Sequence, residues 1–266
     1  MKSITTSAVS RSYLTRSGRE IVALKPTDLT VAAGEFVCLV GPSGCGKSTL
    51  LFLMAGLLEP TSGTVCIDGE LIDGPDPDHG VVFQPDATFP WMTVYENVAF
   101  GPRMRGLSPA DVRDRAQHYL ELVGLGDKGG LWPRELSGGM RKRVDIARAF
   151  ANEPQVLLMD EPFGALDAMT REGLQEELLR IWEGDRKTIV FVTHDLEEAL
   201  YLGTRIVIME RDPNMIRKQV AVDLPASREP LLRTEPHFQE LRRLLWMEMA
   251  ELEDRPDDID KARHDE

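Results

Sequence analysis

The chain lacks long apolar runs, has few cysteines and carries fewer basic than acidic residues. No stretch approaches ~18 uninterrupted apolar residues, and the first residues lack the apolar block of a signal peptide, so we expect a soluble, cytosolic protein. The three cysteines, Cys38, Cys45 and Cys66, are odd in number and follow no metal-ligand spacing, which argues against a disulfide framework and against zinc. The 31 Lys and Arg against 44 Asp and Glu give a formal charge of -13, which argues against a surface that binds nucleic acid or anionic lipid. Any membrane contact is therefore expected to go through another protein.

The most informative segment is residues 41–49, which read GPSGCGKST and fit the pattern G-x-x-x-x-G-K-[ST]. They lie between an apolar, strand-like run at 35–40 and a helix-forming run that begins at Leu50. Glycines let the backbone curl so that successive N–H groups converge on phosphates, and the helix N-terminus adds partial positive charge. In such a loop Lys47 reaches the β- and γ-phosphates and the Ser48 hydroxyl ligates Mg²⁺. The predicted phosphate-binding residues are Gly41, Pro42, Ser43, Gly44, Cys45, Gly46, Lys47, Ser48 and Thr49. The alternative, a glycine-rich turn that happens to precede a helix, is disfavoured because Lys and Ser directly follow the last glycine.

Strand-like and helix-like segments alternate along most of the chain. Short β-type runs occupy the first 40 residues, and residues 65–72 read as a hairpin that turns at Asp68-Gly69. From roughly 86 to 150 helical spacing dominates, which predicts a helical insertion. Strand signals resume at 156–159, 188–192 and 205–209, each separated by a helix-length segment. This order predicts an α/β fold with a parallel core.

Two carboxylates end one of the predicted core strands. Asp160 and Glu161 follow the apolar run 156–159, which places both at the C-terminal edge of a strand, where α/β sheets bind ligands. Asp160 can hold Mg²⁺, and Glu161 can orient or deprotonate water. A loop-capping role is the alternative, and the phosphate-binding loop in the same chain disfavours it.

A second segment that could bind phosphate precedes the acidic pair. Residues 136–140 read LSGGM and are followed by a strongly helical stretch at 141–152. Ser137, Gly138 and Gly139 would form an anion site at the N-terminus of that helix. Because one phosphate loop is already present, a second helix end of this kind suggests a nucleotide shared between two copies. An ordinary N-cap followed by flexible glycines is an equally favoured alternative.

Together these residues resemble the nucleotide-binding subunit of ATP-binding cassette (ABC) transporters over nearly the whole chain. The matching elements occur in the family's order: the adenine-stacking aromatic Tyr13, the Walker A loop 41–49, the Q-loop residue Gln84, the signature 136–140, Walker B ending at Asp160 with Glu161, the D-loop 165–167 and the switch residue His194. Met140 stands where Gln is usual. That residue and the runs 89–101 and 222–225 resemble the importers of the nitrate, sulfonate and taurine group. The resemblance implies a P-loop NTPase fold over residues 1–225, with a RecA-like core, an N-terminal antiparallel β-subdomain and a helical subdomain inserted at about 86–150.

The resemblance also implies roles in a dimer. In this family two subunits meet head to tail around two ATP molecules, so residues 137–139 would act on the partner's nucleotide. Asp167 would lie across the dimer seam. The alternative, that Asp167 is only the N-cap of the helix that starts at Ala168, is nearly as favoured. His194 would stabilise the γ-phosphate or position Glu161. A purely structural histidine is the alternative.

The same resemblance assigns two residues near the nucleotide. Tyr13 would offer its ring face to adenine, with an exposed strand tyrosine as the alternative. Gln84 would contact Mg²⁺ and the attacking water, and its loop would report the γ-phosphate to a partner, with a simple strand-end glutamine as the alternative. Cys45 lies near Lys47 and a helix N-terminus, which both lower the pKa of a thiol, so we expect it to be alkylated faster than Cys38 or Cys66.

Two further surfaces follow from the sequence. Phe89, Trp91 and Tyr95 suit a helix-in-groove contact, and the resemblance implies that a permease helix docks there; core packing of Trp91 is the alternative. Within residues 226–266 an amphipathic helix is expected after Pro236, carried by apolar residues at helical spacing, Phe238, Leu241, Leu245, Met249 and Leu252. The acidic end of the chain is expected to be a disordered tail.

The sequence therefore predicts an ATP-hydrolysing subunit of an ABC importer. It would use ATP and Mg²⁺ and work as a homodimer at the cytoplasmic face of the inner membrane. Its partners would be a permease and, indirectly, an extracytoplasmic solute-binding protein, with no nucleic acid. Glu161, His194, Lys47 and Gln84 would be catalytic, and Ser48, Gln84 and Asp160 would hold the metal. A soluble ABC-type ATPase without a permease and a P-loop kinase of a small metabolite are the alternatives.

Overall fold

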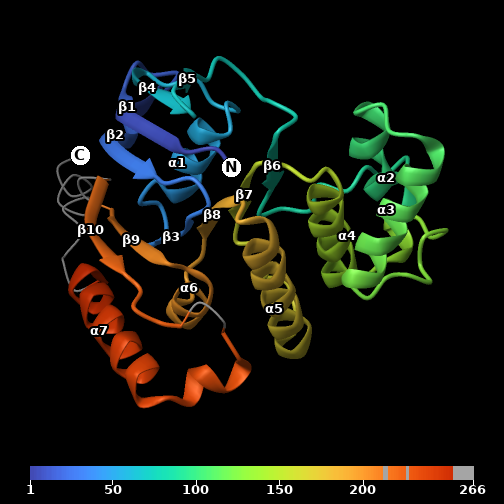
Figure 1. The fold of residues 1–266 in the computed structure, drawn as a ribbon. Coiled ribbons are helices and arrows are strands. Elements are labelled where there is room, and N and C mark those ends of the chain that lie inside the picture. The colour runs from blue at the N-terminus through green and yellow to red at the C-terminus, as the bar shows by residue number, and fades with distance from the viewer. Residues whose placement is uncertain (212–214, 226–227, 254–266) are drawn as a thin grey trace.

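The core of the protein is a six-stranded sheet with the order β10-β9-β3-β8-β7-β6 (Figure 1). The computed structural model describes residues 1–211, 215–225 and 228–253. The sheet contains β3 (Phe36–Val40), β6 (His79–Val82), β7 (Val156–Asp160), β8 (Thr188–Val192), β9 (Arg205–Glu210) and β10 (Met215–Ala221). All pairs are parallel except β9 with β10. Strands β3, β7 and β8 are buried at every position, as apolar runs of a sheet covered on both faces must be. The predicted parallel core is confirmed.

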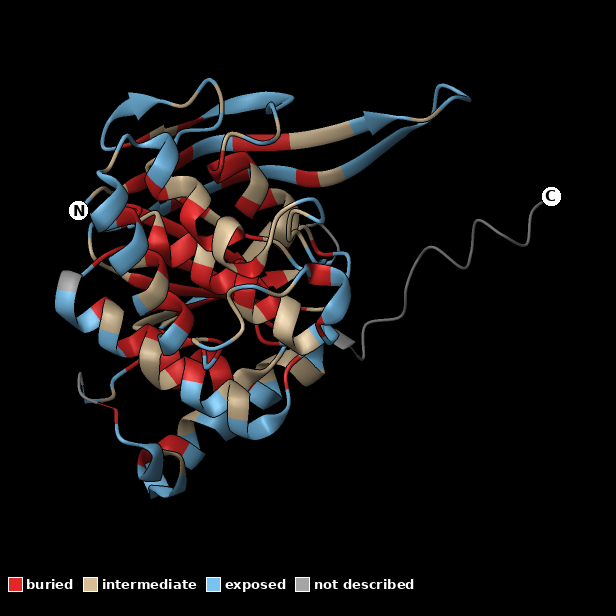
Figure 2. Ribbon diagram, turned by 90° about the vertical axis from the view of Figure 1, so that its right-hand side faces the viewer, coloured by how far each residue is buried: buried red, intermediate tan, exposed pale blue. Residues whose placement is uncertain are grey.

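A second, antiparallel sheet has the order β2-β1-β4-β5. It comprises β1 (Ile4–Leu14), β2 (Glu20–Val31), β4 (Ser62–Ile67) and β5 (Glu70–Leu71). The predicted hairpin turn joins β4 to β5, with positive φ at Asp68 (54°) and Gly69 (83°), which favours a short polar residue followed by glycine. The hairpin of β1 and β2 extends beyond the body of the molecule, and its tip is exposed (Figure 2).

Helices cover both faces of the parallel sheet. Helix α1 (Lys47–Met54) lies between the two sheets and packs its leucines against apolar side chains from both. On the other face lie α5 (Ala168–Asp185) and α6 (Leu196–Leu202), together with the C-terminal α7 (Pro236–Glu253) (Figure 1). The predicted amphipathic α7 is present, and Phe238 and Leu245 are buried in that core. The expected acidic tail after Glu253 lies outside the described residues.

Along the chain, three helices lie between β6 and β7: α2 (Val94–Met104), α3 (Pro109–Leu122) and α4 (Gly138–Ala151). A short 3-10 turn at Pro133–Glu135 precedes α4. Figure 1 shows them gathered at the side of the molecule beyond β6. Each begins at a residue whose side chain accepts a backbone N–H: Thr93 for α2, Ser108 for α3 and Ser137 for α4. The helical character expected for this stretch is therefore present.

A buried arginine is among the contacts that attach the C-terminal segment to the core. A 3-10 turn at Pro230–Thr234 connects to α7, and Arg228 just before it is buried. Its guanidinium donates to the carbonyls of Tyr201 at 2.7 Å and Gly203 at 2.8 Å, at the end of α6. The edge strand β10 was not among the predicted strands. Among the described residues, no helix is both long and apolar enough to cross a membrane.

Candidate functional site

The predicted catalytic residues lie at the C-terminal ends of four neighbouring strands of the parallel sheet. Parallel strands end at the same edge, and β3, β8, β7 and β6 are adjacent in that order. The phosphate loop follows β3, His194 follows β8, Asp160 and Glu161 end β7, and Gln84 follows β6. The fold therefore brings together residues that are more than a hundred positions apart in the sequence.

The loop 41–49 has a backbone that requires glycine at defined positions. Gly44 and Gly46 have φ values of 80° and 96°. A Cβ on Gly46 would lie 2.8 Å from the carbonyl oxygen of Ala23, and one on Gly41 would lie 2.3 Å from that of Met209. Within the described part of the chain, no side chain caps the N-terminus of α1, which starts at Lys47. The first N–H groups of α1 are thus aimed where an anion can bind.

Lys47 is buried and curls over the loop that precedes it. Its Nζ donates to the carbonyl oxygens of Gly41 at 2.8 Å and Pro42 at 2.9 Å. The ammonium therefore lies inside the concave side of the loop, where it would neutralise phosphate charge.

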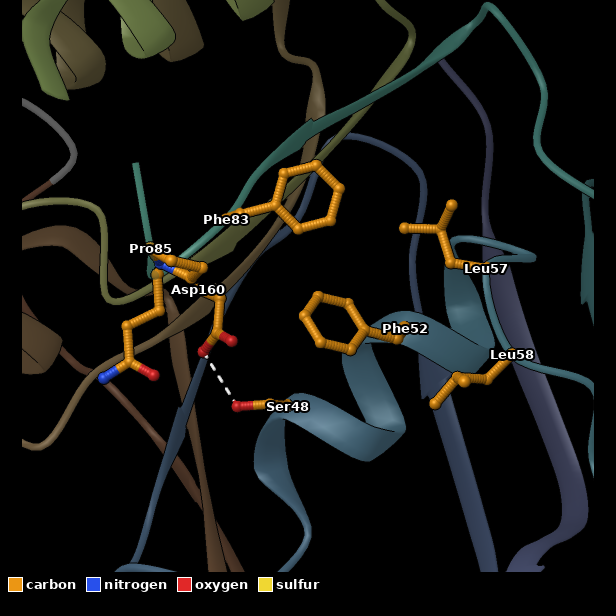
Figure 3. A pocket seen from close by; sticks show the side chains of 8 residues that line it. Ser48, Phe52, Leu57, Leu58, Phe83, Pro85 and Asp160 are labelled. Atoms are coloured by element: carbon orange, nitrogen blue, oxygen red, sulfur yellow. Dashed lines mark hydrogen bonds between the residues drawn. The ribbon is translucent and has the colours of Figure 1, made fainter. Parts of the chain in front are cut away.

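Ser48 and Asp160 meet directly. The Ser48 hydroxyl donates to Asp160 Oδ1 at 3.0 Å (Figure 3). Burial is the main cause that raises the pKa of Asp160, and the bond from Ser48 and the charge of Lys47 oppose it. A hydroxyl and a carboxylate are oxygen ligands of the kind Mg²⁺ takes, with phosphates and water completing the shell. Across the described ranges, no three His, Cys, Asp or Glu side chains gather as an all-protein metal site. The pair therefore fits a magnesium ion that arrives with a nucleotide.

Glu161 forms the centre of a second set of contacts. Gln84 Nε2 donates to Glu161 Oε2 at 3.0 Å, and His194 Nδ1 lies 3.4 Å from the same oxygen. The Glu161 backbone adopts a positive φ of 43°, and its N–H donates to the carbonyl of Val192 at 3.0 Å. A positive φ is strained for a residue with a side chain, and strain of this kind is common at functional sites. The three predicted residues Gln84, Glu161 and His194 are thus brought together.

A pocket of about 420 Å³ opens beside the Ser48–Asp160 pair (Figure 3). The rings of Phe52 and Phe83 both line it and contact each other, with their centroids 5.8 Å apart and their planes tilted by 44°. Its lining is apolar on one side and polar on the other: Ser48, Phe52, Leu57, Leu58, Phe83, Gln84, Pro85 and Asp160. Because Gln84 also lines this pocket, a group bound in it would touch the loop that contacts Glu161.

Side chains of helix α4 form an ion pair and hydrogen bonds with the segment that follows Gln84. Arg141 pairs with Asp86, and Asp145 accepts the backbone N–H of Ala87 at 2.8 Å. Arg148 donates to the carbonyl of Ala87 at 2.8 Å. Sequence reasoning missed these contacts, although charged residues at positions 141, 145 and 148 share one helical face, which is the signal that could have shown them.

The signature residues and Asp167 form another group. Ser137 caps α4 by accepting the N–H of Met140 at 3.3 Å, and Asp167 caps α5 by accepting the N–H of Thr170 at 3.0 Å. That bond lowers the pKa of Asp167. A Cβ on Gly139 would lie 3.5 Å from the carbonyl oxygen of Ala165, so the signature touches the D-loop of its own chain. Ser137 and Gly138 are exposed.

Tyr13 lies on β1 near the exposed end of its hairpin, and 40% of its surface is exposed. The guanidinium of Arg11 stacks over the ring, with Cζ 4.6 Å from the centroid. Arg11 is itself held by the carbonyl of Glu59 at 2.7 Å. One face of the ring is therefore occupied by Arg11, a residue that the sequence reasoning did not single out.

The structure contradicts the lowered thiol pKa on which the predicted fast alkylation of Cys45 rests. Cys45 is fully buried, and burial raises the pKa of its thiol; the charge of Lys47, with Nζ 3.8 Å from Sγ, only partly opposes that effect. The sequence showed the nearby cation but not the packing of the loop against β9 and β2. Cys45 thus lies in the loop as predicted, but as a buried side chain.

The aromatic residues predicted to meet a permease lie where the chain enters α2. Trp91 is 68% exposed, so it is not a core residue. Its ring stacks on Phe89, with centroids 5.5 Å apart, and the guanidinium of Arg148 on α4 lies over the Phe89 ring, 4.5 Å from its centroid. Tyr95 is half-buried and packs against the core. The three aromatic residues do not lie equally open to a partner, and Trp91 is the most exposed.

Comparison with known proteins agrees with this geometry. The ABC transporter family profile matches residues 24–164. The nitrate import ATP-binding protein NrtD of Synechocystis sp. is 47% identical over 236 residues, which cover 86% of this chain and 88% of that protein. The taurine import ATP-binding protein TauB of Pseudomonas aeruginosa is 44% identical over 261 residues, 95% of this chain and 99% of the relative.

A solved structure supports the same assignment. The dimeric structure of a post-hydrolysis state of the ATP-binding cassette MJ0796, bound to ADP and Pi, superposes with a TM-score of 0.76 at 34% identity. The match covers 84% of this chain and 100% of that one. With the phosphate loop, the Ser48–Asp160 pair and the Glu161 contacts on one sheet edge, the chain belongs to the ABC transporter family, as an ATP-binding cassette with the predicted P-loop fold.

Proposed function

We propose that the chain is the ATP-hydrolysing subunit of an importer for a small solute of the nitrate, sulfonate or taurine kind. The observation that carries the proposal is the convergence of Lys47, Ser48, Asp160 and Glu161 at one edge of the parallel sheet. The names of the nitrate and taurine relatives support import as the direction of transport. The solute itself would not touch this subunit.

Hydrolysis would proceed by attack of water on the γ-phosphate of ATP. The loop 41–49 and Lys47 would bind the phosphates, and Ser48 and Asp160, with Gln84 beside them, would hold Mg²⁺, which offsets phosphate charge when bound. Glu161 would accept a proton from the attacking water or orient it. Gln84 and His194, both against Glu161 Oε2, would fix the direction of that carboxylate.

A second copy of the chain would complete each nucleotide site. Ser137 and Gly138 are exposed at the N-terminus of α4, so their N–H groups are available to an anion from outside the protomer. Asp167 would lie at the same seam, because the D-loop contacts Gly139. Tyr13 would stack on adenine with the ring face that Arg11 leaves open.

A permease on the membrane would dock beside the same site, which would place the subunit at the cytoplasmic face. The exposed Trp91 and the apolar side of the pocket lined by Phe52 and Phe83 suit a short helix with apolar side chains. One such side chain in the pocket would touch both Gln84 and the vicinity of Ser48. Docking would thus be linked to the loop that contacts Glu161. A solute-binding protein would act through the permease only.

The variant Glu161→Gln tests the proposal. It should bind ATP and form an ATP-dependent dimer, and its hydrolysis should fall by roughly 10²- to 10⁴-fold, the range for loss of a general base. Light scattering would measure the dimer and phosphate release the turnover. A variant that remains monomeric with ATP, or one that hydrolyses ATP as fast as the parent, would refute this function.

A further inference from the structure

Lys142 is a buried cation that has no part in nucleotide binding or hydrolysis as described above. It lies about one turn after Gly138, the first residue of α4, and only 3% of its surface is exposed. Its Nζ donates to the carbonyl oxygen of Phe83, and to that of Gln84 at 3.0 Å. The side chain therefore crosses from the helix to the loop that contacts Glu161.

The surroundings of Lys142 act on its charge in opposite directions, and burial outweighs the nearby carboxylates. Burying an ammonium is unfavourable unless it is hydrogen-bonded and lies near opposite charge. Burial lowers the pKa of Lys142, and four carboxylates oppose that effect, in decreasing order Asp145, Asp160, Asp86 and Glu161. They come from its own helix, from the end of β7 and from the loop after β6. Two of these four carboxylates, Asp160 and Glu161, belong to the candidate site, so the charge of Lys142 acts on that site although its hydrogen bonds go to the carbonyls of Phe83 and Gln84.

The position of Lys142 differs from that of the other α4 side chains on this loop. Arg141 reaches Asp86, and Asp145 and Arg148 reach the backbone of Ala87. Within the described residues, Lys142 alone of these four bonds the backbone of Gln84 itself. The side chain of Gln84 in turn donates to Glu161. A continuous set of contacts therefore runs from Glu161 through Gln84 and Lys142 to the first turn of α4.

We propose that Lys142 is a positioning residue that makes the Gln84 loop and the N-terminus of α4 move as one unit. The position that Gln84 takes at the nucleotide of its own chain would then determine how the N-terminus of α4 is oriented. That orientation decides how Ser137 and Gly138 face the second copy. This rests on the proposed function, in which Gln84 lies at the nucleotide of its own chain and the start of α4 meets that of the partner. Lys142 touches neither the substrate nor the reacting water.

The test uses the full chain in the Glu161→Gln background, in which ATP is not consumed. Lys142→Met keeps the length of the side chain but removes its donors, and Lys142→Gln restores N–H donors without charge. Lys187→Met is the matched control, because Lys187 is also buried and donates to a carbonyl, that of Pro154, at the far end of β7 from the site. Three quantities are measured: the melting temperature, the Kd of the monomer for ATP and the dissociation constant of the ATP-dependent dimer.

Lys142→Met should weaken the dimer by about tenfold or more, while the Kd of the monomer for ATP changes by less than about threefold, since Lys47, Ser48 and Tyr13 are untouched. Lys142→Gln should recover most of the dimerisation, and Lys187→Met should dimerise like the parent.

Other results would overturn the proposal. If both Lys142 variants dimerise like the parent, Lys142 does not link the loop to α4, and the proposed function still stands. If Lys142→Met lowers the melting temperature and the affinity of the monomer for ATP as much as it weakens the dimer, and Lys142→Gln restores nothing, the residue only supports packing. If Glu161→Gln alone does not dimerise with ATP, the proposed function fails, and the role of Lys142 fails with it.

Discussion

Replacing Arg228 by alanine should destabilise the whole protein strongly. Arg228 is buried, and its guanidinium donates to the carbonyl oxygens of Leu200, Tyr201 and Gly203 at the C-terminus of α6. The last carbonyls of a helix have no partner within the helix, so this arginine satisfies them and also places positive charge at the negative end of the helix dipole. The same side chain donates to the carbonyl of Pro225 at 3.3 Å.

The magnitude follows from these contacts. Each buried carbonyl left without a donor costs about 1–3 kcal/mol, and water entering the space would relieve part of that penalty. For three carbonyls we expect a loss of about 3–5 kcal/mol in the free energy of unfolding. At about 2–4 °C per kcal/mol for a chain of this size, the melting temperature should fall by roughly 6–20 °C.

Urea unfolding followed by circular dichroism is the assay. Arg228→Lys keeps one charged donor group and should fall between the parent and Arg228→Ala. The control is Arg243→Ala, because Arg243 is exposed on α7 and its loss should change the free energy of unfolding by less than about 0.5 kcal/mol. A loss below about 1 kcal/mol for Arg228→Ala, or equal losses for both alanine variants, would refute the reasoning.

Four further predictions concern single side chains. Tyr13→Ala should weaken ATP binding by about 5- to 150-fold, the equivalent of about 1–3 kcal/mol of stacking, as measured by calorimetry, whereas Tyr13→Trp should bind nearly as the parent. Cys45 should react more slowly with iodoacetamide than the partly exposed Cys66, as peptide mass spectrometry would show, because it is buried with a raised thiol pKa. Trp91→Ala should leave the ATPase of the isolated subunit within about twofold but reduce its stimulation by the permease in vesicles, since the ring is exposed and stacks on Phe89 rather than on a phosphate-binding residue. Glu198→Gln should become more stable relative to the parent as the pH of urea unfolding rises from 4 to 8. Burial raises the folded-state pKa of Glu198, so the stability contributed by its protonated form is present at low pH and is lost as the pH rises through that pKa.

Most of the fold could be predicted from the sequence because local pattern and environment agree. The strands β3, β7 and β8 are uninterrupted apolar runs, and such runs are buried in a parallel sheet. The turn at Asp68-Gly69 could be predicted because its two residue types tolerate the positive φ that the turn needs. By contrast β10 reads MIRKQVA, in which three polar residues separate two short apolar pairs. It is half-exposed and lies at the edge of the sheet beside β9, so its sequence carried little signal of a strand.

The sequence predicted which residues form the candidate site but not how deeply each of them is buried. The phosphate-loop motif pointed to Ser48, the end of an apolar strand pointed to Asp160 and Glu161, and the resemblance to the ABC family added Gln84. The burial of Cys45 could not be predicted, since it depends on the approach of Met209 and Ala23 to the loop from distant parts of the chain. Local sequence showed the cation that lowers the pKa of a thiol and gave no sign of the desolvation that raises it.

The charged face of α4 illustrates the same limit at the scale of a helix. A row of charges on a helix normally indicates a solvated face, yet Lys142 and Asp145 are both buried. They are buried because β6 pairs with β7, which directs the loop after β6 across the start of α4. The strand order that brings Gln84 to Glu161 therefore also brings its backbone to Lys142. Lys142, which the sequence alone would place in solvent, therefore lies between the Gln84 loop and α4. These two elements must move together if the nucleotide bound to one chain is to change the contact with a second chain.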